Sequence, residues 1–599
     1  MYFRKRTHNC GELNLNFLNK EVTLNGWISR KRDLGGLLFF DLRDRYGITQ
    51  LKITPDIKNI YKVAEKIGHE FVISATGNVV KRESINKNIP TGEIEIEVND
   101  LDILNESDVT PFVIEEDVKA SDELRLKYRY LDMRRKKFYN NLILRNKVYQ
   151  IVHKYYEKDG FVEIETPILM KSTPEGARDF LVPSRVNKGK FYALPQSPQT
   201  FKQIIMVAGM DKYVQICKCF RDEDLRADRQ PEFTQIDVEM SFVDQSDVFR
   251  ISEGLLKEIW KETLGLDIEI PFLEMTYDDA IEKYGTDKPD LRIRDSMTII
   301  DISENVKDSE FRVFQDALKD GGCVAGLILA SSDNDGNKIE ITRKIIDSLT
   351  DFVKELGFGG LGYFKIEKDG SMKSPISKFF REELLESIKN KFSAEIGDTI
   401  FLLSGSKMDV LSALGKLRIH LAEKFNLIDD SKYEFLWITD FPLFKFDEEE
   451  NKFVGEHHVF TMPKDEYMKN LDSKKREDIE NIRANCYDLV LNGNEIASGS
   501  IRIHKSEIQR KVFNIIGLSE EEANQKFGFL LEAFRYGAPP HGGIAFGYDR
   551  IIAILCGIKF IRDVIAFPKT VSAISLMDAS PNPVSKEQLD ELGITLKKE

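Results

Sequence analysis

The sequence predicts a multidomain protein of the α+β class. Three observations support this prediction: short strand-like runs fill the first hundred residues, helical spacing of apolar residues begins near residue 140, and a stretch of different texture, with glycine clusters, extends from 288 to 420. A chain of 599 residues is also too long for a single hydrophobic core. With 42% apolar and 31% charged residues, the composition is that of a globular chain and excludes a disordered one.

The N-terminal segment predicts a small closed β-barrel. The turn Asp44–Gly47 separates two of its strand-like runs, and a polar stretch after residue 104 is typical of a hinge. The strand-like runs cover 21–28, 37–42, 48–53, 70–80 and 93–98. Five strands in about one hundred residues suit a barrel of the OB type.

A second domain follows the hinge and is interrupted by an insertion. Apolar residues recur at helical spacing between 140 and 159, and Gly160 provides the stop. A strand then covers Phe161–Glu165, and strand-like runs resume at Tyr433–Phe446 after the insertion. We therefore expect a barrel over 1–104, a hinge over 105–135, a second domain in two parts over 136–287 and 421–567, an inserted α+β domain over 288–420 and a C-terminal extension over 568–599.

Composition and charge exclude several classes of protein. No apolar run approaches the ~20 residues of a membrane-spanning helix, and no apolar run follows the basic N-terminus as a secretory signal would require. We therefore expect a cytoplasmic protein without a membrane partner. The net charge of −14 argues against a general nucleic-acid coat but leaves open a specific RNA partner. Cys217 and Cys219 lack a second cysteine pair, which favours alternate positions on a buried strand over zinc ligation.

A charged loop between two strands is the most unusual segment. The stretch Phe220–Glu239 combines several arginines with acidic residues, and Gln235, Asp237 and Glu239 alternate on one face of the returning strand. Guanidinium groups can bind phosphate and carboxylates can bind metal or amine, so the segment could hold a nucleotide. Taken alone, a salt-bridged hairpin explains the same residues more simply.

Two further segments carry weaker signals. The stretch Pro539–Arg550 places a glycine-rich turn before an apolar helix, where the backbone can approach a ligand closely. The stretch Gly160–Pro167 on its own indicates only a packed helix and strand.

In chain order, these three segments resemble signature motifs 1, 2 and 3 of class II aminoacyl-tRNA synthetases. The stretches Thr173–Asp179, Leu194–Gln203 and Gly499–His504 are similar to the bacterial-type aspartyl-tRNA synthetases, and Trp27–Asp33 is similar to their anticodon-binding barrel. The resemblance covers essentially the whole chain. It implies a catalytic domain built on an antiparallel β-sheet with flanking helices. It also implies a homodimeric ligase that joins L-aspartate to tRNA-Asp through an aspartyl-adenylate, with ATP as substrate and Mg²⁺ as cofactor.

The resemblance assigns nucleotide chemistry to motifs 2 and 3. Arg221 would bind the α-phosphate and the substrate carboxylate, Glu223 would read the adenine amino group, and Phe233 and Arg550 would stack on the adenine ring. Catalytic roles fall to Arg221, Glu223 and Arg550. The ATP-binding set is Arg221, Asp222, Glu223, Gln230, Phe233, Glu495, Gly547, Tyr548, Asp549 and Arg550. The metal ligands would be Asp488 and Glu495.

The resemblance also assigns the amino-acid pocket. Lys202 and Arg502 would pair with the substrate side-chain carboxylate, and Asp237 would hold these cations in place. A neutral asparagine amide would leave buried charge unpaired and would be rejected. The aspartate-binding set is Glu175, Ser197, Gln199, Lys202, Arg221, Asp237, His457 and Arg502.

The barrel would contact the anticodon. Arginines suit phosphates or bases, an aromatic ring offers a stacking surface, and amide and carboxylate groups can read base edges. The residues concerned are Arg30, Arg32, Phe39, Gln50 and Glu95. A solvated basic edge is the simpler explanation of Arg30-Lys31-Arg32 taken alone.

Three departures from the family pattern stand out. Val459 stands where the family usually has proline, Ala497-Ser498 stands where glycines are common, and Tyr548 replaces an aliphatic residue. None of them removes a charged catalytic group, so we expect activity to be retained.

Alternative functions make different demands on the sequence. A lysyl-tRNA synthetase would need acidic groups where Lys202 and Arg502 stand, and the large insertion favours the bacterial aspartyl type over an asparaginyl enzyme. A non-catalytic RNA-binding paralogue would lack the charged motif residues, which are present. An enzyme that also charges tRNA-Asn stays an alternative, although Leu34 resembles the strict form.

Overall fold

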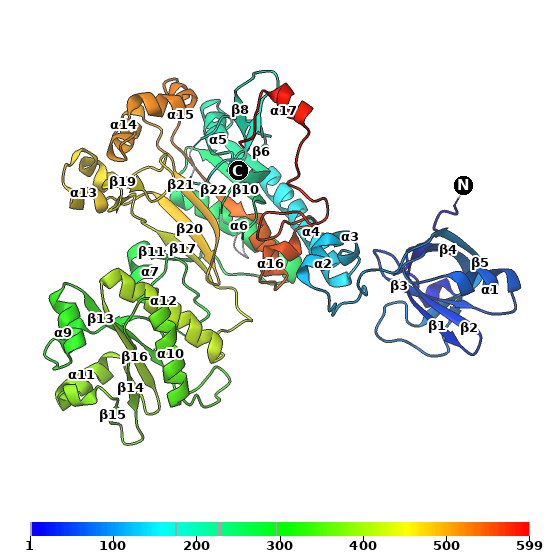
Figure 1. Ribbon diagram of the computed structural model, residues 1–599, viewed down its shortest axis with the longest axis horizontal. Helices are drawn as coiled ribbons and strands as arrows, with labels where there is room; N and C mark the ends of the chain where they lie inside the picture. Colours follow the sequence, from blue (N-terminus) through cyan, green and yellow to red (C-terminus); the bar gives the residue numbers. More distant parts are fainter. Residues whose placement is uncertain (1–2, 174–175, 224–228, 295, 598–599) are drawn as a thin grey trace. The chain divides into compact units, whose positions relative to one another are not determined.

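The computed structural model describes residues 3–173, 176–223, 229–294 and 296–597 (Figure 1). It divides into two compact units, Met1–Lys147 with Leu225–Gln230 and Cys556–Val584, and Val148–Asp224 with Pro231–Leu555 and Ser585–Glu599. This division does not separate the inserted segment, so the five predicted domain boundaries stay predictions.

Five strands close the N-terminal barrel in the order β1-β2-β3-β5-β4. Their bounds are β1 (Glu21–Leu34), β2 (Leu37–Arg43), β3 (Ile48–Ile53), β4 (Val72–Lys81) and β5 (Ile94–Asn105), and helix α1 (Lys58–Lys66) connects β3 to β4. Inward-facing residues such as Leu24, Phe40 and Ile73 are fully buried and form the core. At the bulge of β4 against β5, a Cβ on Gly77 would lie 2.2 Å from the carbonyl oxygen of Glu97, which explains the glycine. The predicted closed barrel is confirmed, and its first and last strands are longer than predicted.

An eight-stranded sheet forms the centre of the second unit, in the order β11-β17-β20-β21-β22-β10-β9-β6. The bounds are β6 (Val162–Glu163), β9 (Lys212–Phe220), β10 (Glu232–Ser241), β11 (Leu273–Thr276), β17 (Phe435–Thr439), β20 (Cys486–Leu491), β21 (Asn494–Ile501) and β22 (His541–Gly547). The edge pairs β11·β17 and β6·β9 are parallel, and the pairs between them are antiparallel. The predicted antiparallel sheet is confirmed. The strand predicted over 161–165 is wrong in extent, because only β6 joins the ladder before Pro167, which has no N–H to donate.

Helices flank this sheet and fix the strands that carry the charged motifs. Helix α5 (Gln199–Val207) contacts β9 and β10, helix α6 (Gln245–Leu264) contacts β22, and helix α16 (Tyr548–Leu555) contacts β10, β21 and β22. The start of α6 is set by a capping box between Asp244 and Asp247, and Gly265 ends it in the left-handed conformation. The remaining elements of this unit outside the insertion are α4 (Lys136–Lys158, which begins in the first unit), β7 (Leu181–Pro183), β8 (Phe191–Ala193), α7 (Tyr277–Tyr284), β18 (Phe444–Asp447), β19 (Lys452–Gly455), the 3₁₀ helix η3 (Asp465–Asp472), α13 (Arg476–Glu480), α14 (Ser506–Ile515), α15 (Glu520–Phe534) and α17 (Lys586–Leu592).

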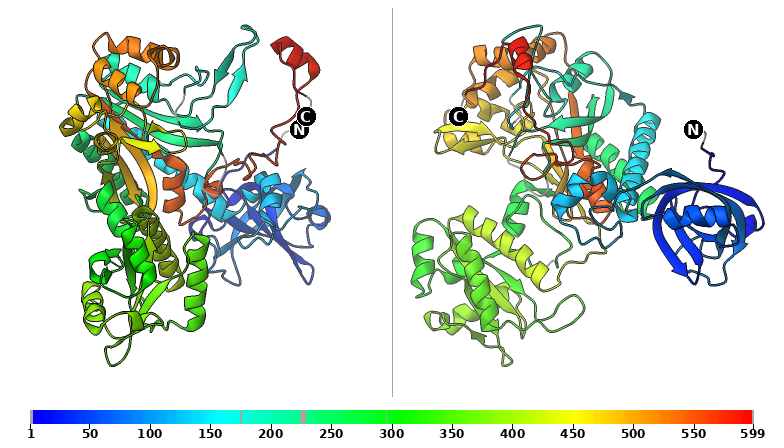
Figure 2. Two further views of the ribbon diagram at one scale, coloured as in Figure 1. Left: turned by 60° about the vertical axis from the view of Figure 1, so that its left-hand side comes forward. Right: turned by 45° about the vertical axis from the view of Figure 1, so that its right-hand side comes forward.

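The inserted segment folds around its own five-stranded sheet, in the order β12-β13-β16-β14-β15 (Figures 1 and 2). Its elements are β12 (Ile300–Asp301), α8 (Ser303–Val306), α9 (Arg312–Lys319), β13 (Cys323–Leu329), α10 (Arg343–Glu355), β14 (Gly362–Ile366), β15 (Met372–Lys373), the 3₁₀ helix η2 (Ser377–Phe379), α11 (Glu382–Lys391), β16 (Thr399–Gly405) and α12 (Lys407–Lys424). Strand β13 is buried along its length because both of its faces are covered. Leu327 packs in the core with α10 and α12, whereas Ile328 packs in the core with α8, α9 and α11.

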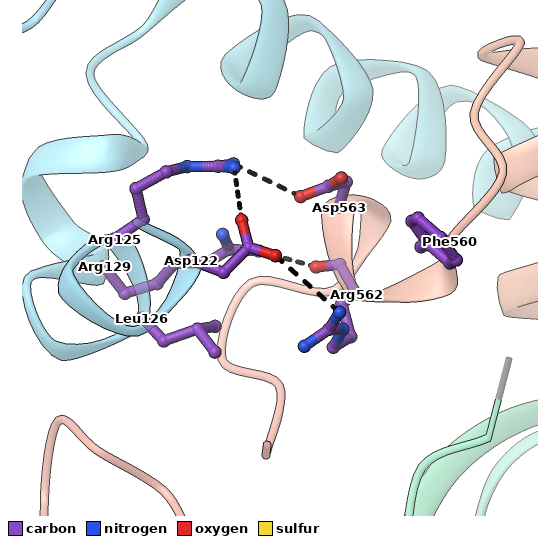
Figure 3. Close-up of a pocket in the computed structure, with 7 residues that line it drawn as sticks. All are labelled: Asp122, Arg125, Leu126, Arg129, Phe560, Arg562 and Asp563. Carbon is purple, nitrogen blue, oxygen red and sulfur yellow. Dashed lines mark hydrogen bonds and ion pairs between the residues drawn. The ribbon is translucent and has the colours of Figure 1, made fainter. Parts of the chain in front are cut away.

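A buried arginine network holds the hinge helices of the first unit to its C-terminal segment. Helices α2 (Asp122–Lys127) and α3 (Arg129–Asp132) line a small pocket together with residues near the short helix η4 (Ile561–Val564), as Figure 3 shows. The guanidinium of Arg129 donates to the carbonyl oxygens of Arg562 (2.6 Å), Ile565 (2.9 Å) and Ala566 (3.0 Å). The fully buried Asp132 carboxylate accepts from Arg129 at 3.0 Å. The segment after motif 3 is therefore held through its backbone carbonyls, and its Asp563 and Arg562 side chains add ion pairs with Arg125 (3.3 Å) and Asp122 (3.9 Å) (Figure 3).

The two neighbouring cysteines and the lengths of the helices bear on two further predictions. Cys217 and Cys219 are both buried on β9, where the Cys219 thiol donates to Gln235 Oε1 at 3.1 Å, so their structural role is confirmed. Across the described part of the chain, no helix combines the length and the apolar character that crossing a membrane requires.

Candidate active site

Two buried cations face two buried carboxylates at the centre of the second unit. Lys202 projects from α5, and its Nζ lies 2.7 Å from Asp237 Oδ1 and 3.1 Å from Glu239 Oε2 on β10. Arg502, which follows β21, donates from Nε to Glu239 Oε1 (2.9 Å) and from Nη2 to Glu239 Oε2 (3.2 Å). Each of these four residues is less than 5% exposed. Since these contacts do not use every N–H of the two cations, donors remain for a ligand carboxylate.

Glu239 is the acid that the sequence-based assignment missed. Asp237 was predicted to hold both cations, and that prediction is wrong for Arg502, because the guanidinium is paired with Glu239 instead. Burial alone would raise the pKa of Glu239, but Arg502 and Lys202 lower it to about 2. Burial raises the pKa of Asp237, and Lys202 offsets part of that rise. The alternation of Asp237 and Glu239 on one strand face was the available signal for this second carboxylate.

Glycines make room for this ion-pair cluster. A Cβ on Gly543 of β22 would lie 2.1 Å from Glu239 Oε2 and 2.2 Å from the carbonyl oxygen of Val238. A Cβ on Gly499 of β21 would lie 2.2 Å from the carbonyl oxygen of Gly543. Gly543 therefore leaves room for the Glu239 carboxylate, and Gly499 lets β21 and β22 pair closely beside it.

A buried chain of polar groups lies beside the cluster. Gln199 Nε2 donates to Gln203 Oε1 (3.2 Å), and Gln203 Nε2 lies 3.2 Å from His541 Nε2. Gln199 was predicted as an aspartate-binding residue, whereas Gln203 and His541 were not. The backbone N–H of Gln199 donates to the half-buried Ser197 hydroxyl at 3.3 Å, which places Ser197 at the start of α5.

Two adjacent histidines are neutral at neutral pH. Burial lowers the pKa of His457 to about 4, even though Glu495 and Asp287 oppose the shift. Burial, Arg502 and Lys202 lower the pKa of His458 to about 3. The loop stays anchored despite Val459, since the Val459 carbonyl accepts from Gln509 Nε2 at 2.8 Å. The predicted aspartate-binding residue Glu175 lies outside the described residues.

Motif 2 presents an arginine over an aromatic ring. Arg221 follows β9, its backbone N–H donates to the Pro231 carbonyl at 2.9 Å, and its guanidinium lies 5.1 Å from the Phe233 ring centroid. Asp222 is exposed, and its backbone N–H donates to the Arg178 carbonyl at 3.0 Å. Glu223 is half-buried at the end of the described part of this loop.

Motif 3 is tied to motif 2 and to the hairpin β20–β21. The Asp549 carboxylate accepts from the Thr234 backbone N–H at 2.8 Å, so its visible role is to hold β10. The guanidinium of Arg550 donates to the Glu495 carbonyl. Tyr548, which follows Gly547 at the end of β22, is fully buried, and its ring lies edge-on to Tyr149. This contact gives the unusual tyrosine a packing role.

Asp488 and Glu495 lie on neighbouring strands of the β20–β21 hairpin. Asp488 is 5% exposed, and its Oδ1 has no hydrogen-bond partner among the described residues. Burial and the neighbouring Glu495 raise the pKa of Asp488 to about 8. Within the described ranges, no three histidine, cysteine or acidic side chains form a metal cage. Mg²⁺ usually takes one or two protein carboxylates together with substrate phosphates, so the pair fits a nucleotide-bound metal.

Gln230 belongs to the first unit. Its Oε1 accepts from the Lys569 backbone N–H (2.7 Å), and its Nε2 donates to the Lys569 carbonyl (3.0 Å). Lys569 lies a few residues after the segment that Arg129 holds. This amide is therefore engaged with the backbone, and its contact with ATP stays a prediction.

In the barrel, three of the five predicted anticodon residues form one hydrogen-bonded network. Arg32 Nη2 donates to Asp41 Oδ1 (2.6 Å) and to Gln50 Oε1 (3.0 Å), and Gln50 Nε2 donates to Glu95 Oε2 (2.6 Å). Phe39 is half-buried and pairs with Arg32 across β1 and β2. Arg30 is exposed. Asp41 was not predicted, although its place opposite a basic strand is compatible with this role.

Matches to protein families cover most of the chain. Residues 121–571 match the family described as tRNA synthetases class II (D, K and N), and residues 22–104 match the OB-fold nucleic acid binding domain. The chain belongs to the class II tRNA synthetases (D, K and N).

Relatives of this synthetase are similar over nearly their whole length. An aspartate--tRNA(Asp/Asn) ligase of Caldanaerobacter subterraneus subsp. tengcongensis is 51% identical, over 99% of this chain and 98% of the relative. An aspartate--tRNA ligase of Clostridium perfringens (strain ATCC 13124) is also 51% identical, with the same coverage. An asparaginyl-tRNA synthetase structure from Pyrococcus horikoshii, complexed with asparaginyl-adenylate, has a TM-score of 0.57 at 18% identity and covers 94% of this chain and 98% of its own. This structural likeness shows the fold alone.

Proposed function

We propose that the synthetase activates L-aspartate with ATP to aspartyl-adenylate and transfers the aspartyl group to the 3′ end of tRNA-Asp. The observation that carries the proposal is the buried pair of cations, Lys202 and Arg502, each fixed by a carboxylate and each with donors left for a ligand. The names of the two relatives support the same substrate.

Recognition of aspartate follows from charge. Two cations and two carboxylates already stand in the pocket, and the side-chain carboxylate of the substrate would accept the remaining N–H donors of Lys202 and Arg502. An asparagine amide would offer no negative charge, and its NH₂ would face these donors. We expect its binding free energy to be weaker than that of aspartate by roughly 3–5 kcal/mol. Ser197, Gln199, His457 and Glu175 complete the proposed pocket.

Activation needs positive charge at the phosphates. Arg221 would stabilise the charge that develops as the substrate carboxylate attacks the α-phosphate, while Glu223, Phe233 and Arg550 position the adenine. Asp488 and Glu495 would hold Mg²⁺, which would add positive charge beside the phosphates when bound. The neutral state of His457 lets it contact the substrate without repelling the ammonium group.

The tRNA, the dimer and the location are further parts of the proposal. The barrel residues would contact the anticodon, with the exposed Arg30 as the first phosphate contact. A homodimer is supported by exposed apolar side chains around the motif 1 strand, namely Val162, Ile168 and Leu169. We propose a cytoplasmic location because the tRNA substrate is used there.

A relaxed enzyme that also charges tRNA-Asn is the second candidate. A relative at 51% identity is named for both tRNAs, and another at the same identity is named for tRNA-Asp alone. Sequence identity to these relatives therefore does not distinguish an enzyme strict for tRNA-Asp from one that charges both tRNAs.

The proposal is tested by aspartate-dependent ATP–pyrophosphate exchange. We expect exchange with L-aspartate and not with L-asparagine, and loss of at least about a hundredfold in kcat/KM in Arg502→Gln, because a buried charge-assisted contact is removed. Arg535→Gln is the matched control, since Arg535 is an exposed arginine paired with Glu532 on the surface. Normal aspartate activation by Arg502→Gln would overturn the pocket assignment.

A further inference from the structure

Lys288 reaches the carboxylates of the proposed metal site from the base of the inserted domain. Its Nζ lies 2.8 Å from Glu495 Oε2 and 3.6 Å from Asp287 Oδ2. None of the roles assigned above uses this lysine. It follows α7 and precedes the inserted sheet, so it belongs to a part of the chain outside the three signature motifs.

The backbone around Lys288 is held against the β20–β21 hairpin. The buried Asp290 carboxylate accepts from Arg292 Nη2 at 2.7 Å, and the Asp290 carbonyl accepts from the buried Arg418 at 3.1 Å. The Asp290 Cβ would lie 3.2 Å from a Cβ on Gly493, at the turn of the hairpin. Pro289 restricts the conformation of the residue before it. Lys288 is therefore directed at Glu495 by a constrained backbone and not by a mobile loop.

The ion pair between Lys288 and Glu495 neutralises only one of the two carboxylates of the proposed metal site. Lys288 binds the outer carboxylate of Glu495, whereas Oδ1 of the inner, buried Asp488 has no hydrogen-bond partner among the described residues. The side chains of Lys288 and Glu495 are 38% and 32% exposed, so their pairing is screened by solvent and contributes little to folding. A divalent ion that binds both carboxylates would satisfy the inner oxygen as well, which a lysine held at Glu495 does not do.

We propose that Lys288 is a resident counter-ion of the nucleotide site, which occupies Glu495 when no metal–nucleotide complex is bound and is displaced from it when the complex binds. This inference rests on the proposed metal role of Asp488 and Glu495. The ammonium group weakens the binding of a divalent cation when no nucleotide is present. Once displaced, it lies beside the polyphosphate chain that arrives with the metal.

Direct metal binding tests this role without relying on turnover. The probe is Mn²⁺, titrated into the nucleotide-free full-length protein and followed by the electron paramagnetic resonance signal of the free ion. We expect Lys288→Gln to bind Mn²⁺ about tenfold more tightly than the unaltered protein, because a unit positive charge within a few ångströms of the ligands is removed. Lys288→Arg should behave like the unaltered protein because it keeps the charge.

Two further variants distinguish an error in the role of Lys288 from an error in the proposed metal site. Lys283→Gln removes a half-exposed lysine of α7 that pairs with Asp279 at 3.4 Å, and it should leave Mn²⁺ binding unchanged. Glu495→Gln should abolish Mn²⁺ binding by the nucleotide-free protein, because one of the two proposed carboxylate ligands is removed. Equal or weaker Mn²⁺ binding by Lys288→Gln, with Glu495→Gln still defective, would overturn the counter-ion role and leave the metal site standing. Unchanged binding by Glu495→Gln would overturn the metal site itself, and with it the role of Lys288.

Discussion

Glu239 and Arg502 form a two-point ion pair, with Nε 2.9 Å from Oε1 and Nη2 3.2 Å from Oε2. The pairing fixes the plane of the guanidinium, because a fork of two parallel hydrogen bonds allows little rotation. Lys202 also contacts Glu239, so a single carboxylate orients both cations of the pocket. The specificity that we propose for aspartate therefore depends on a residue that does not itself contact the substrate.

Glu239→Gln should damage specificity more than it damages the fold. The amide keeps the shape of the carboxylate but leaves two buried cations with less compensation, which we expect to cost about 3 kcal/mol of stability. Urea denaturation measures this loss. Pyrophosphate exchange should show a raised KM for aspartate and a smaller preference over asparagine, whereas the exposed Glu274→Gln on β11 should change neither.

Gly543→Ala should be far more harmful than an alanine at a helical glycine with open space around it. The new Cβ would meet Glu239 Oε2 at 2.1 Å and the Val238 carbonyl at 2.2 Å, so the strand or the ion pair must shift. We expect a loss of about 2–4 kcal/mol and little remaining aspartate activation. Gly528→Ala in α15, where nothing lies within 4 Å of the new Cβ, should be neutral or stabilising by up to about 1 kcal/mol. Equal stabilities for the two variants would show that the glycine is not needed for packing.

Acid should weaken the fold partly through His458. Its folded-state pKa of about 3 lies below its ordinary value of about 6.5, so the unfolded chain binds more protons between these values. This contribution to stability is complete above pH 6.5 and is lost as the pH falls toward 3. His458→Asn should flatten the decline of the unfolding free energy over this window. A decline as steep as that of the unaltered protein would mean that other groups account for it.

Arg129→Ala should destabilise the first unit. The substitution leaves three backbone carbonyls without this donor and removes one of the three arginines that pair with the buried Asp132, a loss of about 3–5 kcal/mol. Arg129→Lys should recover only part of it, because one ammonium group cannot reproduce the planar fork. Full recovery by lysine, seen in thermal unfolding, would mean that charge alone matters at this position.

Arg30→Ala should weaken tRNA charging and spare the first reaction. Arg30 is exposed, whereas Lys31 donates to carbonyls at the end of α1 and Arg32 is paired with Asp41. We expect the KM for tRNA-Asp to rise by up to about tenfold, with unchanged pyrophosphate exchange in the absence of tRNA. The matched control is Arg312→Ala, an exposed arginine of the inserted domain. Equal loss of both reactions in Arg30→Ala would contradict the division of labour between barrel and catalytic sheet.

Local patterns in the sequence predicted the strands and helices better than they predicted which distant side chains contact one another. Alternation and turn residues were enough for the barrel, because β1, β2 and β3 pair consecutively and β4 pairs with β5, although closure also needs the distant pairs β1·β4 and β3·β5. Glu239 was assigned no role because its partner Arg502 lies far away in sequence, and the two meet only when β21, β22 and β10 pair. The same holds for Lys288, whose reach to Glu495 depends on how the base of the insertion packs on a hairpin. The fold also distinguishes basic residues that look alike in sequence. Arg30 is exposed, whereas Lys31 binds backbone carbonyls and Arg32 pairs with Asp41.

The most direct test of the proposed function is aminoacylation of purified tRNA-Asp and tRNA-Asn transcripts with radiolabelled aspartate and ATP. We predict that tRNA-Asp is charged with aspartate, and charging of tRNA-Asn in the same assay would identify the relaxed form of the enzyme. Failure to charge either transcript, by protein that is folded and binds ATP, would contradict the account.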